Sequence, residues 1–163
     1  MPWRNYEAAK FLETIAKLLI INGDDPYRIR AFMNAALSLR FMQSDVGDLH
    51  RSGRLEAVPG IGAGIAARLG EYLDTGRSSY LEDLKRQSPV AAADLLEVPG
   101  IGPVRVAQLY DYLGITTIAE LDEAARAGRL RLVPGIGKRL EEIIGQGAAG
   151  ILRRRRIWRS GAA

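Results

Sequence analysis

The chain contains the pentapeptide Val-Pro-Gly-Ile-Gly three times, at Val58–Gly62, Val98–Gly102 and Val133–Gly137. Proline lacks an N–H group and drives the preceding residue into extended backbone, so each copy ends the helix before it. The first glycine permits a left-handed turn, and the second opens a helix whose first N–H groups have no partner within that helix. One copy would be only a tight corner in a helical bundle, whereas three copies predict a repeated functional unit.

The start of each new helix is bare backbone with a partial positive charge, which favours binding of a phosphate. The isoleucine of each pentapeptide is expected to fill the space between the two helices. This is the pattern of a helix-hairpin-helix, which holds a nucleic-acid backbone without reading the bases. The residues expected to contact nucleic acid are Gly60, Gly62, Gly64, Arg68, Gly100, Gly102, Arg105, Gly135, Gly137, Lys138 and Arg139.

Two other glycine-rich phosphate motifs do not match. A dinucleotide fingerprint needs a third glycine three residues after the second, and those positions hold Ile65, Arg105 and Leu140. A Walker phosphate loop needs Gly-Lys-Ser/Thr, but Gly137-Lys138 is followed by Arg139.

Composition limits the remaining classes of protein. The 163 residues suit one domain or two small ones. The chain has no cysteine and one histidine, His50, so disulfides and thiolate metal sites are excluded. No apolar run reaches the roughly 20 residues of a membrane span, and the first residues lack a signal peptide, so we expect a soluble, cytoplasmic protein without a membrane partner.

The net charge of +4 has a local origin. The segment Arg153–Arg159 holds five arginines, and subtracting them from the 23 basic residues leaves 18 against 19 acidic ones. The rest of the chain is therefore almost neutral. Attraction to phosphate is expected from oriented N–H groups and local cations, with a separate basic tail of Arg153, Arg154, Arg155, Arg156 and Arg159.

Apolar spacing predicts helices throughout. Ala8, Phe11, Leu12, Ile15, Leu18 and Leu19 follow helical periodicity up to a stop at Asn22-Gly23. Asp25 and Pro26 start a second helix that is expected to bury Ile29, Phe32, Met33, Ala36 and Leu37. Further helices are expected at 45–51, 62–74, 80–86, from Ser88-Pro89, at 102–113, at 118–127 behind a Thr117/Glu120 capping box, and at 137–146. Strand signals are missing, so the predicted fold class is all-α.

The repeat also suggests two small helical domains. Gly53-Arg54-Leu55 precedes the first pentapeptide and Gly128-Arg129-Leu130 precedes the third, so these two units are more alike than either is to the second. We expect one hairpin in a domain of residues 1–86, two hairpins in a domain of residues 87–150, and the basic tail at 151–163.

An ordered set of motifs closely resembles the amino-terminal half of family X DNA polymerases (the DNA polymerase beta-like family), especially its bacterial members. The resemblance runs from about Tyr6 to Gly145. The motifs are Asp24–Phe32, Val58–Ala66, Asp74-Thr75-Gly76, Val98–Pro103 and Leu113-Gly114-Ile115. It implies a lyase-like helical domain followed by a thumb-like, DNA-gripping domain. The catalytic palm that follows in the family is not part of this sequence, and we expect no polymerase activity, because strands and an Asp-x-Asp metal pair are missing.

The resemblance also places the family's lyase lysine on Arg68. A guanidinium stays protonated and cannot attack an aldehyde, so the expected lyase site is inactive and the catalytic set is empty. A second family lysine falls on Gly64 and a glutamate on Ala67. An abasic-site (5′-deoxyribose phosphate) lyase that uses Lys10, Lys17 or the N-terminal amine is an alternative.

Phosphate contacts are the part of the family site that matches. Tyr27, Arg28, Arg30 and Phe32 correspond to the family's 5′-phosphate pocket, and Arg68 would add a bidentate phosphate contact. The family also binds K⁺ or Na⁺ at its hairpins through backbone carbonyls. Those positions are Glu56, Val58 and Ile61, then Leu96, Val98 and Ile101, and in the third hairpin Arg131, Val133 and Ile136. No organic cofactor is expected.

The sequence therefore predicts a non-catalytic, sequence-independent DNA-binding module for duplex, gapped or nicked DNA in DNA repair. Two further interpretations remain besides the DNA-binding module and the lyase. One is a module that docks a partner such as a repair protein or an RNA, and the other is a fragment of a full-length family X polymerase.

Overall fold

The computed structural model describes residues 3–161, and every element among them is helical, which confirms the all-α class. The chain divides into two compact units, and the boundary along the sequence lies between Gln87 and Ser88. The first contains α1 (Trp3–Ile21), α2 (Pro26–Phe41), α3 (Val46–Arg51), η1 (Leu55–Ala57), α4 (Ala63–Thr75) and α5 (Ser79–Gln87). The second contains α6 (Ala92–Leu96), α7 (Pro103–Leu113), α8 (Ile118–Arg126), η2 (Leu130–Leu132) and α9 (Lys138–Gly161).

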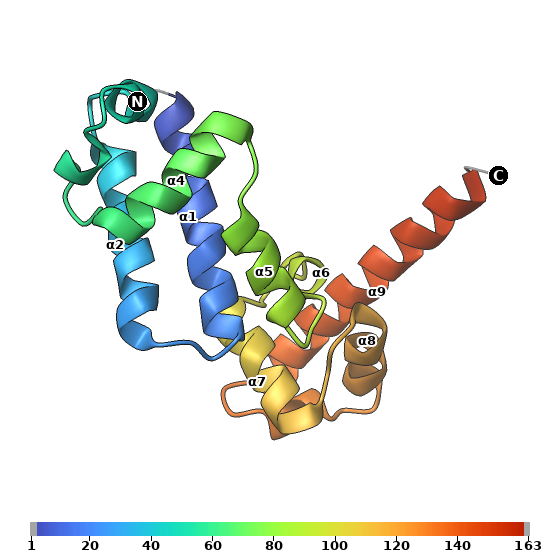
Figure 1. Cartoon of the computed structure of the whole chain (residues 1–163). Helices are drawn as coiled ribbons and strands as arrows, with labels where there is room; N and C mark the ends of the chain where they lie inside the picture. The colour runs from blue at the N-terminus through green and yellow to red at the C-terminus, as the bar shows by residue number, and fades with distance from the viewer. Residues whose placement is uncertain (1–2, 162–163) are drawn as a thin grey trace. The chain divides into compact units, whose positions relative to one another are not determined.

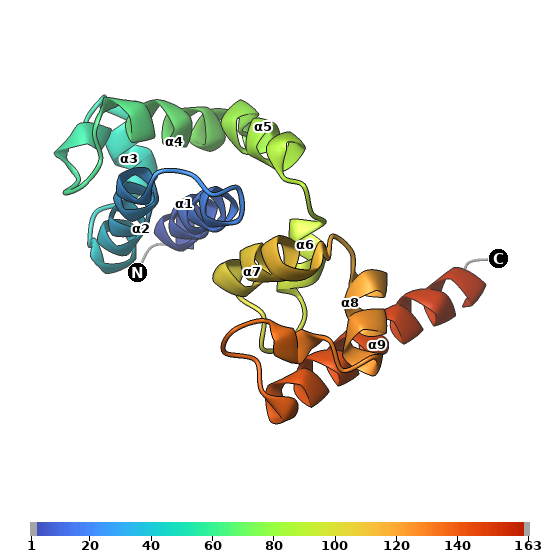
Figure 2. The same cartoon turned by 90° about the horizontal axis from the view of Figure 1, so that it is seen from below.

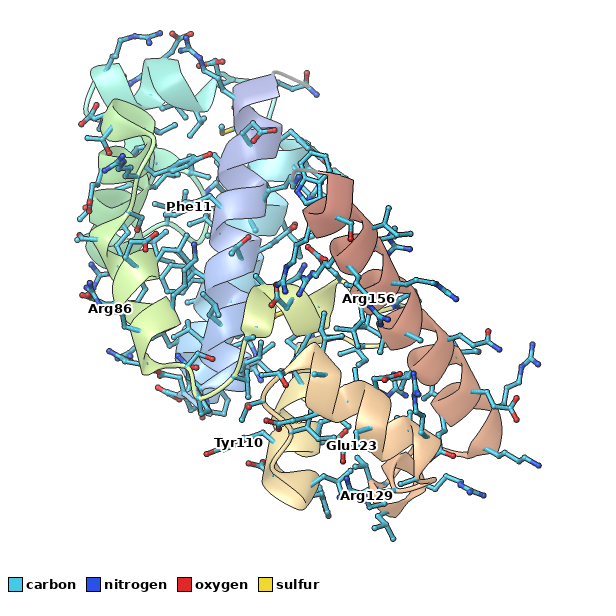
Figure 3. All side chains as sticks on the ribbon, turned by 90° about the vertical axis from the view of Figure 1, so that its right-hand side faces the viewer. Phe11, Arg86, Tyr110, Glu123, Arg129 and Arg156 are labelled. Carbon is cyan, nitrogen blue, oxygen red and sulfur yellow. The ribbon has the colours of Figure 1, made fainter. Side chains whose placement is uncertain are left out.

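In the first unit, α1 and α2 lie side by side and the later helices pack around α1 (Figures 1 and 2). The six apolar residues predicted for the core face of α1 are all buried. Phe11, which is labelled in Figure 3, stacks on Tyr72 of α4, with ring centroids 4.2 Å apart. Asn5, also fully buried, accepts a hydrogen bond from the N–H of Val46 at 2.8 Å and donates one to the carbonyl of Ser44.

Helix α2 begins as predicted, because the Asp25 carboxylate accepts the N–H of Tyr27 at 3.0 Å and Pro26 is the first helical residue. Its buried face is different from the predicted one. Met33 and Leu37 are 48% and 53% exposed, whereas Ala35 and Leu39 are buried with Phe32 and Ala36. The exposed pair lies one helical turn apart, and α1 packs on the neighbouring face of α2.

Two predicted boundaries in the second unit are wrong. Helix α6 begins at Ala92 and not at Ser88-Pro89, because Ala91 has a non-helical ψ angle of 72°, and its N–H donates to the carbonyl of Thr116 at 2.9 Å. The helix expected to end near Gln146 continues to Gly161, so the basic tail is the end of α9.

Close packing at two glycines explains why α9 continues past Gln146. A Cβ at Gly147 would lie 2.8 Å from Cδ of Pro99, and one at Gly145 would lie 3.1 Å from Cβ of Ala125. These glycines let α9 approach the second hairpin and α8 closely, and this tertiary contact offsets the low helix propensity of glycine.

Thr117 caps α8 as predicted, since its hydroxyl accepts the N–H of Glu120 at 3.2 Å. The reciprocal half of the capping box is shifted by one residue. The Glu120 carboxylate receives the N–H of Thr116 at 3.0 Å and its hydroxyl at 3.1 Å.

Candidate nucleic-acid interface

The three pentapeptides form the same turn. In each, the isoleucine N–H donates to the valine carbonyl three residues earlier, at 3.0 Å, 3.1 Å and 3.1 Å. The first glycines have φ angles of 85°, 86° and 87° at Gly60, Gly100 and Gly135. Proline followed by a glycine with positive φ is the signature of a type II turn. The predicted repeat is therefore a repeat of backbone geometry as well as of sequence.

The prediction that the first and third hairpin repeats resemble each other is confirmed. Gly53 and Gly128 both end a helix with positive φ, and a short 3₁₀ helix (η1 or η2) then leads into the turn. Before the second pentapeptide, Val98–Gly102, the α-helix α6 leads into the turn instead.

The second glycines start the following helices. Gly62 and Gly102 have extended backbone, with φ of −92° and −108°, and precede α4 and α7. A Cβ built at either of them, or at Gly137, would meet no described atom within 4 Å. The three isoleucines between the helices, Ile61, Ile101 and Ile136, are buried as predicted. Each helix start is therefore anchored by a buried isoleucine and sterically open, as close approach of a phosphate requires.

The surroundings of the turns differ. A Cβ at Gly60 would lie 3.7 Å from the backbone nitrogen of Ala35, and the hydroxyl of Ser38 donates to the carbonyl of Pro59 at 2.6 Å. A Cβ at Gly100 would lie 3.0 Å from Leu140 of α9. At Gly135 no described atom would lie within 4 Å of it. The third turn is thus the most open of the three.

The charges at the helix starts differ as well. Lys138 and Arg139 form the first turn of α9, are exposed, and make no ion pair within residues 3–161. Arg105 of α7 donates to the carbonyl of Gly100 in its own turn at 3.3 Å. The first turn of α4 begins with Ala63 and Gly64, without a cation. Cations at a helix start oppose the helix dipole, and a bound phosphate would offset that cost.

The third hairpin is braced by Glu141, which the sequence analysis did not select. Glu141 is only 6% exposed, and its carboxylate lies 3.1 Å from Nε of Arg131 and accepts the N–H of Arg131 at 3.3 Å. The charge of Arg131 is thereby neutralised. The carboxylate fixes η2 to α9 and so holds the turn between them.

Arg68 lies on α4, after the first hairpin. Its guanidinium carbon lies 3.9 Å from the ring centroid of Tyr80, whose ring stacks on Phe32 with centroids 6.0 Å apart. Phe32 is buried, whereas Arg68 and Tyr80 are half-buried. Within the described residues Arg68 has no carboxylate partner, so its N–H donors remain free for an anion.

The other predicted pocket residues lie at the start of α2. Tyr27 is 78% exposed, and the Arg30 guanidinium lies 6.0 Å from the Tyr27 ring centroid. Arg28 forms an ion pair with Asp24 at 3.2 Å. Contacts therefore join Phe32 to Arg68 through Tyr80, while Arg28 and Arg30 have their own local partners.

The amines of the lyase alternative lie on α1, apart from the N-terminal amine, which is outside the described residues. Lys10 and Lys17 are both exposed, and the Lys10 ammonium lies 5.5 Å from the Tyr6 ring centroid. The nearby Glu13 forms a bidentate ion pair with Arg40 of α2, at 2.6 Å and 2.9 Å. This hydrogen-bonded guanidinium lowers the pKa of Glu13 below its ordinary value.

The basic end of α9 is partly anchored. Arg155 forms hydrogen bonds to the carboxylate of Asp94 on α6 at 3.0 Å and 3.4 Å, and lies 3.7 Å from Glu97. The other four arginines, Arg153, Arg154, Arg156 and Arg159, are exposed and make no ion pair within residues 3–161 (Figure 3 labels Arg156).

Two other observations concern the described residues alone. Among them, no cluster of three or more histidine, aspartate or glutamate side chains is placed to hold a metal ion. None of their helices combines the length and apolar character needed to cross a membrane.

Comparison with known proteins identifies the class to which these hairpins belong. Residues 3–78 match a helix-hairpin-helix domain, and residues 92–144 match a SAM-like helix-hairpin-helix tandem. The chain is therefore built of helix-hairpin-helix domains, a DNA-binding class of fold.

A curated relative makes the resemblance more specific. Over 143 residues the chain is 36% identical to the DNA polymerase/3'-5' exonuclease PolX of Bacillus subtilis (strain 168). The match covers 86% of this chain but 25% of that protein, so the chain spans about a quarter of its relative's length. The resemblance to the amino-terminal region of a family X polymerase is confirmed.

Proposed function

We propose that this chain binds the sugar-phosphate backbone of DNA without reading its sequence. The observation that carries the proposal is the threefold repetition of one turn followed by an open helix start. Backbone N–H groups at a helix start bind phosphate oxygens through geometry shared by all nucleotides. Binding of this kind positions DNA and does not distinguish bases.

The three hairpins contribute unequally. The third has the most open turn and two free cations, Lys138 and Arg139, and the second has Arg105 beside its turn. The first has no cation in its first helical turn, and the exposed Glu56 precedes it. Most of the affinity therefore comes from the second and third hairpins.

Gapped or nicked DNA with a 5′-phosphate is the proposed preferred ligand. Support comes from Arg68, whose guanidinium is held over Tyr80 and has no carboxylate partner among the described residues. A terminal phosphate carries more charge than a bridging one and offers oxygens for a bidentate contact. Such ends arise in DNA repair, which is the setting we propose.

The proposed module has no catalytic residue of its own. The relative's name describes a polymerase and exonuclease, and this chain matches a quarter of that protein. A second candidate function, favoured by that match, is to supply the DNA-gripping part of a longer polymerase. The lyase alternative would depend on Lys10 or Lys17, which lie exposed on α1.

Weak binding of K⁺ or Na⁺ at the hairpins is a further part of the proposal. The turn carbonyls are hard oxygen donors that suit such cations. The carbonyls of Val58, Val98 and Val133 each accept one N–H of the turn, and a second lone pair remains on each oxygen. DNA affinity should then be higher in K⁺ than in tetramethylammonium at equal ionic strength.

The test is fluorescence anisotropy on duplex DNA with the double variant Gly102→Leu/Gly137→Leu. A Cβ at either position would meet no described atom within 4 Å, and the backbone of Gly102 is extended. The leucines should therefore block phosphates without disturbing the core. The matched comparison is Gly62→Leu at the start of α4, which has no neighbouring cation. We expect at least a tenfold loss of duplex affinity for the double variant and a smaller loss of duplex affinity for Gly62→Leu. Unchanged duplex affinity in a folded double variant overturns the proposal.

A further inference from the structure

The last turns of α9 extend beyond the packed part of the second unit (Figures 1 and 2). Ile151 is the last buried residue of the helix, and residues 153–159 are exposed apart from the half-buried Arg155. In this sequence no acidic residue follows Glu142, so this end of α9 supplies no carboxylate to its five arginines, and only Arg155 has acidic partners, on or next to α6. Arginines three or four residues apart on one helix repel each other, and a polyanion would relieve the repulsion.

An exposed tryptophan lies among these arginines. Ile144, Ile151 and Trp158 are seven residues apart and so share one side of α9. The first two are 0% and 5% exposed, but Trp158 is 78% exposed. Arg154 and Arg155 precede it by one turn on the same side, and Arg159 follows it. A flat, exposed indole on an arginine-rich helix end has the composition of a base-stacking platform.

The position of Trp158 separates it from the hairpins. Trp158 is 20 residues after Lys138 in α9, which corresponds to about 30 Å at 1.5 Å per residue. A helix whose N-terminus points at a phosphate directs its C-terminus away from that phosphate. The two ends of α9 are therefore too far apart to contact the same phosphate.

We propose that the C-terminal end of α9 is a second, separate site that binds single-stranded nucleic acid. Arg153, Arg154, Arg156 and Arg159 contact phosphates, and an unpaired base stacks on Trp158. Single strands are favoured over duplex because a base exposes its face only when it is unpaired and unstacked. Arg155, held by Asp94 and Glu97, fixes the orientation of this helix end. The inference rests on the proposed function in taking nucleic acid as the ligand.

The experiment follows Trp158 emission while the full-length chain is titrated with an oligothymidine of eight nucleotides. It uses a Trp3→Phe background, because Trp3 is the other tryptophan of the chain. We expect saturable quenching, and about a tenfold or greater loss of oligothymidine affinity, measured by anisotropy, in Trp158→Ala, while duplex affinity changes little. Ile157→Ala is the matched control, since Ile157 is the neighbouring residue and is 67% exposed. It should leave oligothymidine binding within about twofold.

The hairpin double variant Gly102→Leu/Gly137→Leu separates the two proposals. Retained quenching by oligothymidine together with lost duplex binding supports two independent sites. Duplex binding without quenching overturns this inference and leaves the proposed function intact. Equal losses in Trp158→Ala and Ile157→Ala overturn it as well, as does a DNA-independent, concentration-dependent shift of Trp158 emission, which would show a contact between protein chains.

Discussion

The guanidinium of Arg68 lies 3.9 Å from the centre of the Tyr80 ring, at the position where the polymerase relatives are expected to carry a lyase lysine. A primary amine would be a nucleophile at this place, whereas a guanidinium is a permanent cation. Stacking on the ring limits its motion and leaves its edge free to donate hydrogen bonds. We therefore expect this position to bind a phosphate and to carry out no covalent chemistry.

The first prediction concerns covalent chemistry. The wild-type chain should give no adduct when it is treated with borohydride in the presence of DNA with a 5′-deoxyribose phosphate, because Arg68 cannot form a Schiff base. Gel electrophoresis of labelled DNA provides the measurement. An adduct that disappears in Lys10→Arg/Lys17→Arg would contradict this expectation and establish the lyase alternative.

The second prediction concerns the 5′-phosphate. Arg68→Ala should reduce the preference for a phosphorylated over an unphosphorylated gap by about 10- to 150-fold, since a charged hydrogen bond contributes about 1.5–3 kcal/mol. Anisotropy with the two DNAs measures the ratio. Tyr80→Phe is the control, because it keeps the ring under the guanidinium. An unchanged ratio in Arg68→Ala would assign the phosphate to another site.

The third prediction concerns salt. If four to six phosphates are neutralised, the logarithm of the binding constant should fall with the logarithm of salt concentration with a slope of about −4 to −5. Lys138→Ala/Arg139→Ala should reduce that slope by about 1–2, because each lost phosphate contact removes about 0.9. A slope that stays the same would show that these cations do not face the DNA.

The fourth prediction concerns the packing of α9. Gly147→Ala places a methyl group 2.8 Å from the Pro99 ring and should destabilise the protein by about 1–3 kcal/mol, because the rigid ring has to move. Gly150→Ala is the matched control in the same helix, with only the flexible end of Arg154 nearby at 3.5 Å. It should stabilise the helix by up to about 1 kcal/mol. Urea unfolding followed by circular dichroism measures both, and equal effects would contradict the close approach.

The fifth prediction concerns pH. The bidentate Arg40 guanidinium lowers the pKa of Glu13 in the folded protein below its unfolded value. When the pKa of a carboxyl group is lower in the folded than in the unfolded state, its contribution to stability is fully present at pH values above the unfolded-state pKa. That contribution is lost as the pH falls through the folded-state pKa. The stability difference between the wild type and Glu13→Gln should therefore be largest at neutral pH and shrink in acid. Urea unfolding between pH 7 and pH 3 tests this expectation, which a constant difference would contradict.

Tertiary contacts account for the predictions that failed. The low helix propensity of Gly145 and Gly147 indicates a helix end near Gln146, but their missing side chains are what allow α9 to lie against Pro99 and Ala125. Met33 and Leu37 fit a helical apolar stripe, yet α1 packs on the neighbouring face of α2. Ser88-Pro89 looks like a helix start, but the N–H of Ala91 is bonded to Thr116, which is distant in sequence.

The sequence by itself determined the helical class and the three turns, because both depend on local backbone preferences. Proline with a glycine of positive φ specifies the turn wherever the pair occurs, and apolar spacing specifies which face of α1 is buried. Only the tertiary structure decided how the hairpins differ, through Ser38 on the first turn, Leu140 beside the second, and Glu141 beneath the third. Those contacts join residues between 10 and 40 positions apart, and a local pattern holds no information about which distant side chain will arrive there.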